Sequence, residues 1–265
     1  MENYAFLNVQ KDESGIETVT LNRPDKLNAW HDAMIEEFQR LAAALADDDS
    51  LRAVIITGAG RAFSAGEDVG GMEEMATSMS TRRFRAIARK VHDFFDALEA
   101  LEVPVIAAIN GVAAGGGLEL ALSCDFRIAG DQARMGFPEG NVGLIPGSGG
   151  ISRLVKLVGL GRAKELVMLG EILPAPQALA YGLVHRVVPQ QELVTETYAF
   201  AQKLLKKAPL SLGMAKLAIN RAIDIDAATG RDLERIAQST LLPTQDHLEG
   251  ARAFLEKRPP QWQGR

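Results

Sequence analysis

The stretch that decides the fold is VIAAINGVAAGGGLEL, which occupies residues 105–120. It begins with five consecutive apolar residues, Val105 to Ile109, a run typical of a strand that is buried on both faces. A turn of small residues follows, and a helix is expected to begin near Gly116. A buried strand that leads through a tight turn into a helix is the unit from which parallel α/β sheets are built.

The same alternation continues on both sides of this stretch. Other short apolar or β-rich runs predict strands at residues 6–10, 16–21, 53–57 and 126–129, the first two forming a hairpin. Apolar residues at three- and four-residue steps predict helices at 31–45 and 81–101. Beyond about Gly150 the pattern changes to helices with one short apolar run at 183–188. We therefore expect an α/β core domain over residues 1–192 and a helical region over residues 193–265.

Composition narrows the class of protein. Of the 265 residues, 47% are hydrophobic and 24% are charged, as in ordinary globular proteins. The formal net charge of −5 argues against a general attraction to nucleic acid or to an anionic membrane. A single cysteine, Cys124, excludes an internal disulfide, and no apolar run reaches the length of a membrane span. No secretory signal is visible at the N-terminus, so we expect a cytoplasmic protein.

Several motifs fail on inspection. The glycine-rich segments complete neither the dinucleotide fingerprint nor the phosphate loop of nucleotide hydrolases, and the four histidines lack metal-ligand spacing, so no metal is expected. Residues 62–66 loosely resemble the nucleophile elbow of a serine hydrolase, with Ser64 as nucleophile and His185 or His247 as its base. This hydrolase is the remote alternative from another enzyme class.

Two small-residue turns are more informative. One spans residues 60–69 after a predicted strand, and the other spans residues 109–120. Ligand sites of α/β sheets lie where such turns leave the carboxyl ends of the strands. The two turns could each direct one backbone amide at a single oxygen atom, as in an oxyanion hole.

Three ordered motifs resemble the enoyl-CoA hydratase/isomerase (crotonase) family. They are FSAGEDV at residues 63–69, NGVAAGGGLELA at 110–121, and FPE at 137–139 followed by GLIPGSGG at 143–150. The likeness runs from LNRP at residues 21–24 to EGARAFLEKR at 249–258. It implies a spiral of β-β-α units, a helical C-terminal trimerisation region, and a homotrimer or homohexamer.

The resemblance also implies the site. The thioester carbonyl would lie between the backbone amides of Glu67 and Gly116, and two glutamates, Glu119 and Glu139, would surround one water. We expect Glu119 to stay ionised, because it lies in the first turn of a helix, and to activate the water. Glu139 would donate a proton to C2, and we expect desolvation in a loop close to the apolar acyl chain to favour its protonated form. The side chain of Glu67, where the family often has a small residue, is expected to point away from the oxyanion.

Contacts to the acyl-CoA thioester are implied for Lys26, Ala65, Asp68 and Val69, and for Phe254 and Lys257 of a neighbouring subunit. Coenzyme A belongs to the substrate, so no separate cofactor is expected. The implied activity is hydration of a trans-2-enoyl-CoA to a 3-hydroxyacyl-CoA in fatty-acid or related catabolism. An enoyl-CoA isomerase or another acyl-CoA enzyme of the family is the alternative. Gly140-Asn141 departs from the bulkier residues common in the family, and residues 70–75 are expected to form a wall of the acyl pocket.

Overall fold

The computed structural model describes residues 3–68, 70 and 77–265. Val69 and most of the expected pocket wall at 70–75 therefore lie outside the described residues. The main sheet has six strands in the order β1-β2-β3-β5-β7-β10, of which only the β1–β2 pair is antiparallel. Its strands are β1 (Leu7–Lys11), β2 (Ile16–Leu21), β3 (Ala53–Gly58), β5 (Val105–Ile109), β7 (Phe126–Gly130) and β10 (Arg186–Val188).

A second sheet consists of short strands in the order β4-β6-β8-β9: β4 (Ala62–Ser64), β6 (Val112–Ala114), β8 (Arg134–Gly136) and β9 (Ile172–Pro174). From β3 the chain passes to β4 and then to α3 (Thr81–Ala100), and from β5 to β6 and α4 (Gly116–Ser123). From β7 it passes to β8, to the 3-10 helix η3 (Pro138–Val142) and to α5 (Gly150–Leu169). This repeat of one strand from each sheet and a helix is the expected spiral of β-β-α units.

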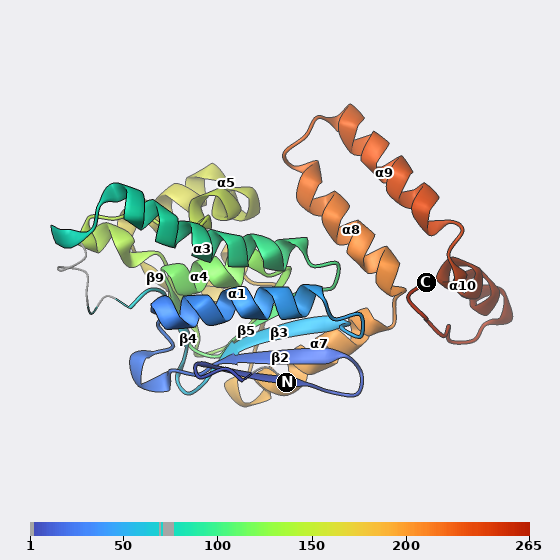
Figure 1. Ribbon diagram of the computed structural model, residues 1–265, viewed down its shortest axis with the longest axis horizontal. Coiled ribbons are helices and arrows are strands. Elements are labelled where there is room, and N and C mark those ends of the chain that lie inside the picture. The colour runs from blue at the N-terminus through green and yellow to red at the C-terminus, as the bar shows by residue number, and fades with distance from the viewer. Residues whose placement is uncertain (1–2, 69, 71–76) are drawn as a thin grey trace.

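Alternating residues of the main sheet enter two different cores. In β5, Val105, Ala107 and Ile109 belong to the larger core, whereas Ile106 and Ala108 belong to the smaller one. The larger core lies under α1 (Asp32–Ala46), α3 and α4, and the smaller one under α7 (Leu193–Leu205). Figure 1 shows α1 and α3 on one side of the sheet and α7 on the other. A strand buried on both faces explains the unbroken apolar run in the sequence.

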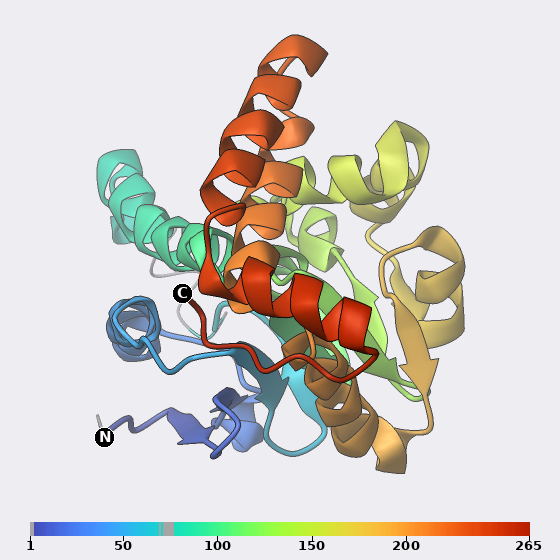
Figure 2. The ribbon, with the colours of Figure 1, turned by 90° about the vertical axis from the view of Figure 1, so that its right-hand side faces the viewer.

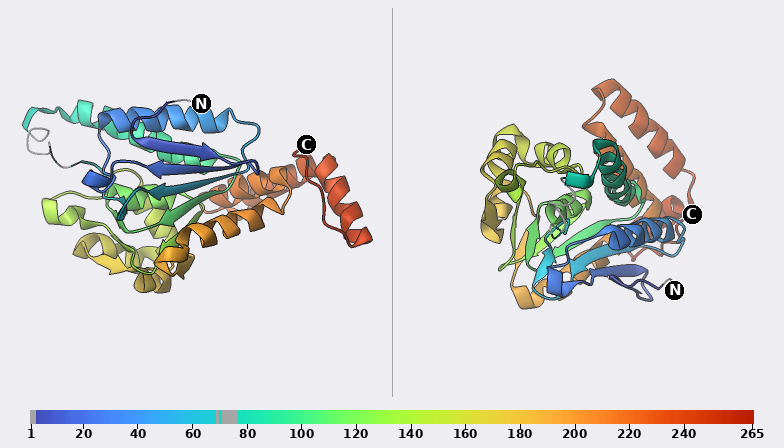
Figure 3. Two further views of the ribbon diagram at one scale, coloured as in Figure 1. Left: turned by 90° about the horizontal axis from the view of Figure 1, so that it is seen from below. Right: turned by 60° about the vertical axis from the view of Figure 1, so that its left-hand side comes forward.

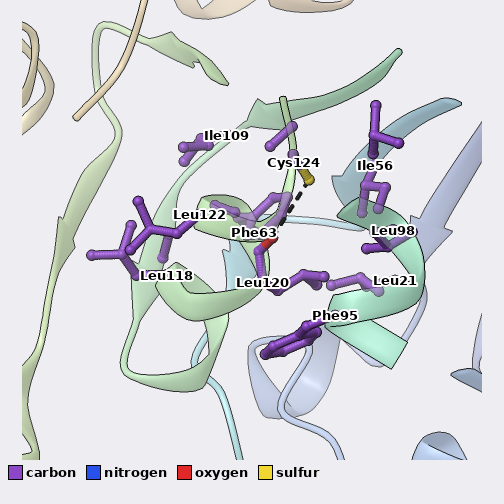
Figure 4. Packing of buried hydrophobic residues seen from close by; sticks show 14 of the residues in the cluster. Leu21, Ile56, Phe63, Phe95, Leu98, Ile109, Leu118, Leu120, Leu122 and Cys124 are labelled. Atoms are coloured by element: carbon purple, nitrogen blue, oxygen red, sulfur yellow. Dashed lines mark hydrogen bonds between the residues drawn. The ribbon is translucent and has the colours of Figure 1, made fainter. Parts of the chain in front are cut away.

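Aromatic side chains hold α1 and α3 together within the larger core. The rings of Phe38 and Phe94 stack with centroids 4.5 Å apart, and Phe95 packs edge-on against Trp30 at 6.1 Å. Figure 4 shows Phe95 beside Leu120 of α4, with Phe63 of the second sheet nearby. All these rings are buried, so close packing contributes to the position of α3.

The C-terminal helices leave the core. After α6 (Ala175–Tyr181), the short helix η4 (Gln190–Glu192) and α7 come α8 (Pro209–Ala222), α9 (Ala227–Leu241) and α10 (Gln245–Glu256). In Figures 1 and 2, α8 and α9 form an antiparallel pair that projects away from the sheets, and the left view of Figure 3 shows α10 at the far end. Every residue of α9 is at least partly exposed.

Sequence and structure agree where periodicity is strong. The strands predicted at 16–21 and 105–109 are β2 and β5 residue for residue, and the helix predicted at 81–101 is α3. The short strands β4 and β6 fall where the sequence predicted turns, because three residues in a glycine-rich segment show no alternation. Within the described part of the chain, no helix is long and apolar enough to cross a membrane.

Arg127 of β7 supplies a test of the core. Its buried guanidinium donates hydrogen bonds to the carbonyls of Leu183 at 2.7 Å, Cys124 at 2.7 Å and Ala121 at 3.3 Å, which ties β7 to α4 and to the chain before β10. Replacing Arg127 with Met would remove these bonds and leave the Leu183 and Cys124 carbonyls without this donor, whereas the Ala121 carbonyl keeps the Cys124 amide. The free energy of unfolding should therefore fall by about 2–4 kcal/mol.

The measurement is equilibrium unfolding in urea. Arg134→Met is the matched control, because Arg134 is exposed and its loss should change stability by less than about 0.5 kcal/mol. Equal stability of the two variants would show that the Arg127 hydrogen bonds contribute nothing to the fold.

Candidate active site

Two backbone turns meet at one edge of the second sheet. Because β4 and β6 pair in parallel, the turns that follow them leave on the same side. A Cβ atom on Gly66 would lie 2.8 Å from the Gly116 nitrogen, and one on Gly117 would lie 2.1 Å from the Ser64 carbonyl oxygen. Gly66 also has a φ of +87°, which disfavours any side chain. Only glycine permits this approach of the two turns.

The backbone amides of Glu67 and Gly116 are available at this junction. Trp30 donates to the Gly66 carbonyl and accepts from the Asp68 amide, each at 2.8 Å, so the Glu67 N–H faces away from Trp30 in this parallel bridge. Gly116 is the first residue of α4, and the first amides of a helix have no intrahelical acceptor. Among the hydrogen bonds of the described residues, neither amide is used as a donor.

Glu119 projects from the first turn of α4 and is buried, with 2% of its surface exposed. Its Oε1 atom accepts hydrogen bonds from the amides of Ser148 and Gly150, both at 2.8 Å. Burial raises the pKa of Glu119, and the two amide hydrogen bonds oppose that rise because they favour the charged form. Backbone amides at the start of α5 and just before it thus hold this carboxylate by hydrogen bonds.

Glu139 lies in η3, directly after Pro138, with its carboxyl group against Gly115. A Cβ atom on Gly115 would be 3.0 Å from the Oε1 atom of Glu139. Its Oε2 atom is buried and has no hydrogen-bond partner among the described residues. Burial raises the pKa of Glu139 to about 7, with a smaller rise from the negative charge of Glu119. The two glutamates are therefore electrostatic neighbours in contrasting surroundings.

Glu67 brings a third carboxyl group near this pair. Partial desolvation raises its pKa although the residue is exposed, and the negative charges of Asp32 and Glu119 raise it further. Its side chain therefore remains within electrostatic reach of Glu119, at the solvent-facing side of the junction.

The structure gives different surroundings to the residues expected to contact substrate. Lys26 is exposed at the end of the 3-10 helix η1 (Pro24–Lys26), on the segment that precedes Trp30. Ala65 lies in the first turn, with its amide bonded to the Leu27 carbonyl at 2.9 Å. The Asp68 carboxylate pairs with Arg23 at 2.6 Å and accepts from the Gly70 amide at 3.0 Å, so it holds the turn in place.

Phe254 and Lys257 are not brought to the junction within one chain. Both belong to α10 or its C-cap, and α10 lies at the opposite end of the molecule from α4 and β4 (Figure 1). Phe254 is 84% exposed. The expectation that these residues act from a neighbouring subunit remains a prediction.

The hydrolase alternative is wrong for Ser64. Its hydroxyl is fully buried, donates to the Asn28 carbonyl at 2.9 Å and accepts from the Gly66 amide at 3.0 Å. His185 instead accepts from the Arg127 amide at 3.2 Å, and His247 belongs to the distant α10. Ser64 thus shapes the turn and has no histidine base. In the described residues we also find no group of three potential metal ligands.

Several residues at the site were not predicted from the sequence. Ser148 and Gly150, whose motif was recognised without a role, supply the amides that hold Glu119. Trp30 covers Gly116, since a Cβ atom there would lie 2.5 Å from its ring. Three apolar side chains also follow Glu139 at the surface: Val142, Leu144 and Ile145, which are 50–68% exposed. The sequence signal for them is the presence of three apolar residues within six positions after Glu139.

A separate cavity of about 810 Å³ lies between α8 and the ends of α3, α4 and α5. It is lined by ion pairs such as Lys216–Asp125 at 2.9 Å and Arg153–Glu99 at 2.8 Å. None of the three glutamates at the turn junction lines this cavity. The three carboxyl groups of the turn junction and this cavity thus lie in different parts of the described structure.

The chain is similar to known proteins over nearly its whole length. The family model described as enoyl-CoA hydratase/isomerase matches residues 11–265. A short-chain-enoyl-CoA hydratase of Clostridium acetobutylicum is 41% identical over 251 residues, covering 94% of this chain and 95% of that protein. A crotonyl-CoA hydratase of Syntrophomonas wolfei is 40% identical over 256 residues, covering 96% of each.

Solved structures give the same result. The crystal structure of an enoyl-CoA hydratase from Bacillus anthracis superposes with a TM-score of 0.92 at 39% identity, covering 98% of this chain and 100% of that one. A putative enoyl-CoA hydratase from Streptomyces coelicolor superposes with a TM-score of 0.94 at 35% identity, covering 100% and 96%. Similarity over the full length, at this identity, shows that the chain belongs to the enoyl-CoA hydratase/isomerase family.

Proposed function

We propose that the protein is an enoyl-CoA hydratase, which adds water across the C2–C3 bond of a trans-2-enoyl-CoA to give a 3-hydroxyacyl-CoA. The observation that carries this proposal is the presence of two glutamates in contrasting surroundings beside two unused backbone amides. Glu119 is held by two N–H donors, whereas Glu139 has a buried oxygen without a partner among the described residues. One carboxyl group is suited to act as a base and the other as an acid.

The amides of Glu67 and Gly116 would hold the thioester oxygen. As water adds at C3, negative charge moves through C2 to that oxygen, and fixed N–H donors stabilise it without reorganisation. Because the glycine contacts hold both turns in place, these donors would be oriented before the substrate arrives. The step that forms the enolate-like charge is therefore the one that this junction favours.

Proton transfers complete the reaction. Ionised Glu119 removes a proton from the water as its oxygen bonds to C3, and protonated Glu139 gives its proton to C2 as the charge returns from the oxygen. The net change adds H and OH to the double bond, and it leaves Glu119 protonated and Glu139 ionised. Exchange of protons with solvent restores both groups. These steps need no metal or redox cofactor.

The apolar side chains of Val142, Leu144 and Ile145 are suited to line the acyl chain, since they follow Glu139 at the surface. Lys26 would meet a phosphate of coenzyme A. The first experiment is hydration of crotonyl-CoA and of longer and aromatic enoyl-CoA esters, followed by loss of the enoyl absorbance. Tight acyl-CoA binding without turnover would favour an isomerase of the same family.

We also propose that the chain assembles as a homotrimer or homohexamer through its C-terminal helices. Apolar side chains are exposed on or at the ends of α8, α9 and α10. Each is more than half exposed: Ile219, Ile223, Ile236, Leu242, Leu248, Phe254 and Leu255. Such a row on projecting helices is typical of a surface that another subunit covers. The same contact would bring Phe254 and Lys257 to a neighbour's site.

Replacement of either glutamate tests the division of labour. Glu119→Gln and Glu139→Gln keep the volume but remove proton transfer, so each should lower kcat by about 10² or more while acyl-CoA affinity changes little. The double variant should lose far less than the sum of the two effects, because both groups act in one transition state. Steady-state hydration and calorimetric binding of the product provide the measurements.

Exchange of the C2 proton with solvent distinguishes the two roles. We expect exchange to survive partly in Glu119→Gln and to be lost in Glu139→Gln, if Glu139 serves C2. Near-normal hydration by both single variants would refute the two-glutamate mechanism.

The pH dependence follows from Glu139. A proton donor must be protonated, and the pKa of Glu139 is about 7, so kcat/KM should fall as pH rises above about 7. At low pH, kcat/KM should also fall, because Glu119 must be ionised to accept a proton from water. The measurement is a pH profile of kcat/KM in buffers of constant ionic strength. A profile that stays flat above neutrality would contradict the assignment of Glu139 as the acid.

Removal of residues 237–265 should break the assembly and weaken acyl-CoA binding, as judged by sedimentation and by calorimetry. Phe254→Asp is a milder test, because this exposed side chain contributes little within one chain. Arg252→Gln on the same helix is the matched control. An active protein that sediments as a monomer before any change would rule out the proposed assembly.

A further inference from the structure

The segment Gly147–Gly150 lies between Glu119 and α3. On one side, its Ser148 and Gly150 amides hold the Glu119 Oε1 atom at 2.8 Å each. The fit leaves no spare room, since a Cβ atom on Gly150 would be 2.6 Å from that oxygen. The position of this segment therefore determines where the Glu119 carboxylate is held.

The other side of the segment is held by two side chains. His92 of α3 places its Nε2 atom 2.6 Å from the Gly147 carbonyl oxygen, and Arg153 donates from Nη1 to the Ser148 carbonyl at 3.1 Å. Since a carbonyl only accepts, the Nε2 atom of His92 must carry the proton. A Cβ atom on Gly149 would lie 2.2 Å from Nη1 of Arg153, so this side is closely packed as well.

Both holding groups depend on α3. Arg153 is itself bound by Glu99, through hydrogen bonds of 2.8 and 3.1 Å, and by Asp96 at 2.6 Å. His92 belongs to the same helix, one residue after Val91, which is buried. A rigid helix thus holds the carbonyl side of the segment while Glu119 occupies the amide side.

We propose that α3 clasps the Gly147–Gly150 segment through His92 and Arg153, and that His92 is thereby a positioning residue for Glu119. This inference rests on the proposed hydratase function for its kinetic consequence, but not for its structural one. The clasp keeps two N–H donors aimed at one carboxylate oxygen. It thereby orients that carboxylate toward the water and favours its ionised form.

His92→Ala removes the hydrogen bond to Gly147. We expect kcat to fall about tenfold while the affinity for a 3-hydroxyacyl-CoA stays within about twofold, because His92 would act on alignment and not on substrate contact. The acid limb of the kcat profile should move to higher pH, because looser amide donors stabilise ionised Glu119 less and because the interaction with His92 that lowers the pKa of Glu119 is lost as well. Other charged groups whose fields reach Glu119 stay unchanged: Glu67, Glu139 and Arg153.

Two further variants separate the possible causes. Asp93→Ala alters the next residue of α3, which is exposed and whose side chain forms no hydrogen bond or ion pair among those of the described residues. This change should leave all parameters unchanged. His92→Gln keeps an N–H donor but cannot carry a charge, so recovery of most of the lost kcat would assign the effect to the hydrogen bond. Failure of glutamine to restore kcat, where alanine lowers it, would overturn the proposal in favour of a charge effect.

A measurement without substrate keeps the inference separate from the proposed function. Hydrogen exchange at the Ser148 and Gly150 amides should accelerate at least tenfold in His92→Ala and not in Asp93→Ala. Unchanged exchange would overturn the clasp even if the protein hydrates enoyl-CoA. Accelerated exchange in a protein that hydrates no enoyl-CoA would support the clasp and reject the hydratase function.

Discussion

The contact between two glycine-bearing turns is the constraint on which the site depends. Gly66 and Gly116 meet with no room for a side chain, and Gly117 approaches the Ser64 carbonyl as closely. The approach follows from topology, because parallel pairing of β4 with β6 sends both turns to one edge. A substitution that keeps the strands but adds a methyl group here would separate the amides.

The sequence predicted the fold well where apolar periodicity is strong and poorly where strands are short. A strand buried on both faces, such as Val105–Ile109, is visible as an unbroken apolar run. The second sheet was not predicted, because its strands have three residues each and their pairing partners are remote in the sequence. The glycine-rich motifs marked the site, yet they could not reveal that β4 and β6 are neighbours.

The surroundings of the two glutamates were likewise only partly predictable from the sequence. The position of Glu119 in the first turn of α4 predicted that the helix dipole favours its ionised form. The structure adds two amide donors from residues about thirty positions later, and a burial that acts in the opposite direction. For Glu139, the expectation that an apolar setting favours the protonated form agrees with a pKa raised to about 7. The local sequence indicated whether each glutamate favours its ionised or its protonated form, while tertiary contacts determine how strongly it does so.

The aromatic packing between α1 and α3 connects these features. The Trp30 ring packs against Phe95 of α3 and also lies against Gly116 at the turn junction. The stacked pair Phe38 and Phe94 fixes α3 against α1. The helix placed by these rings carries His92, whose contact reaches the segment that holds Glu119. One buried cluster therefore sets the position of a backbone amide at the turn junction and, through α3, of the carboxylate opposite it. In the proposed mechanism, the geometry of the acid–base pair is thus kept by residues that need not touch the substrate.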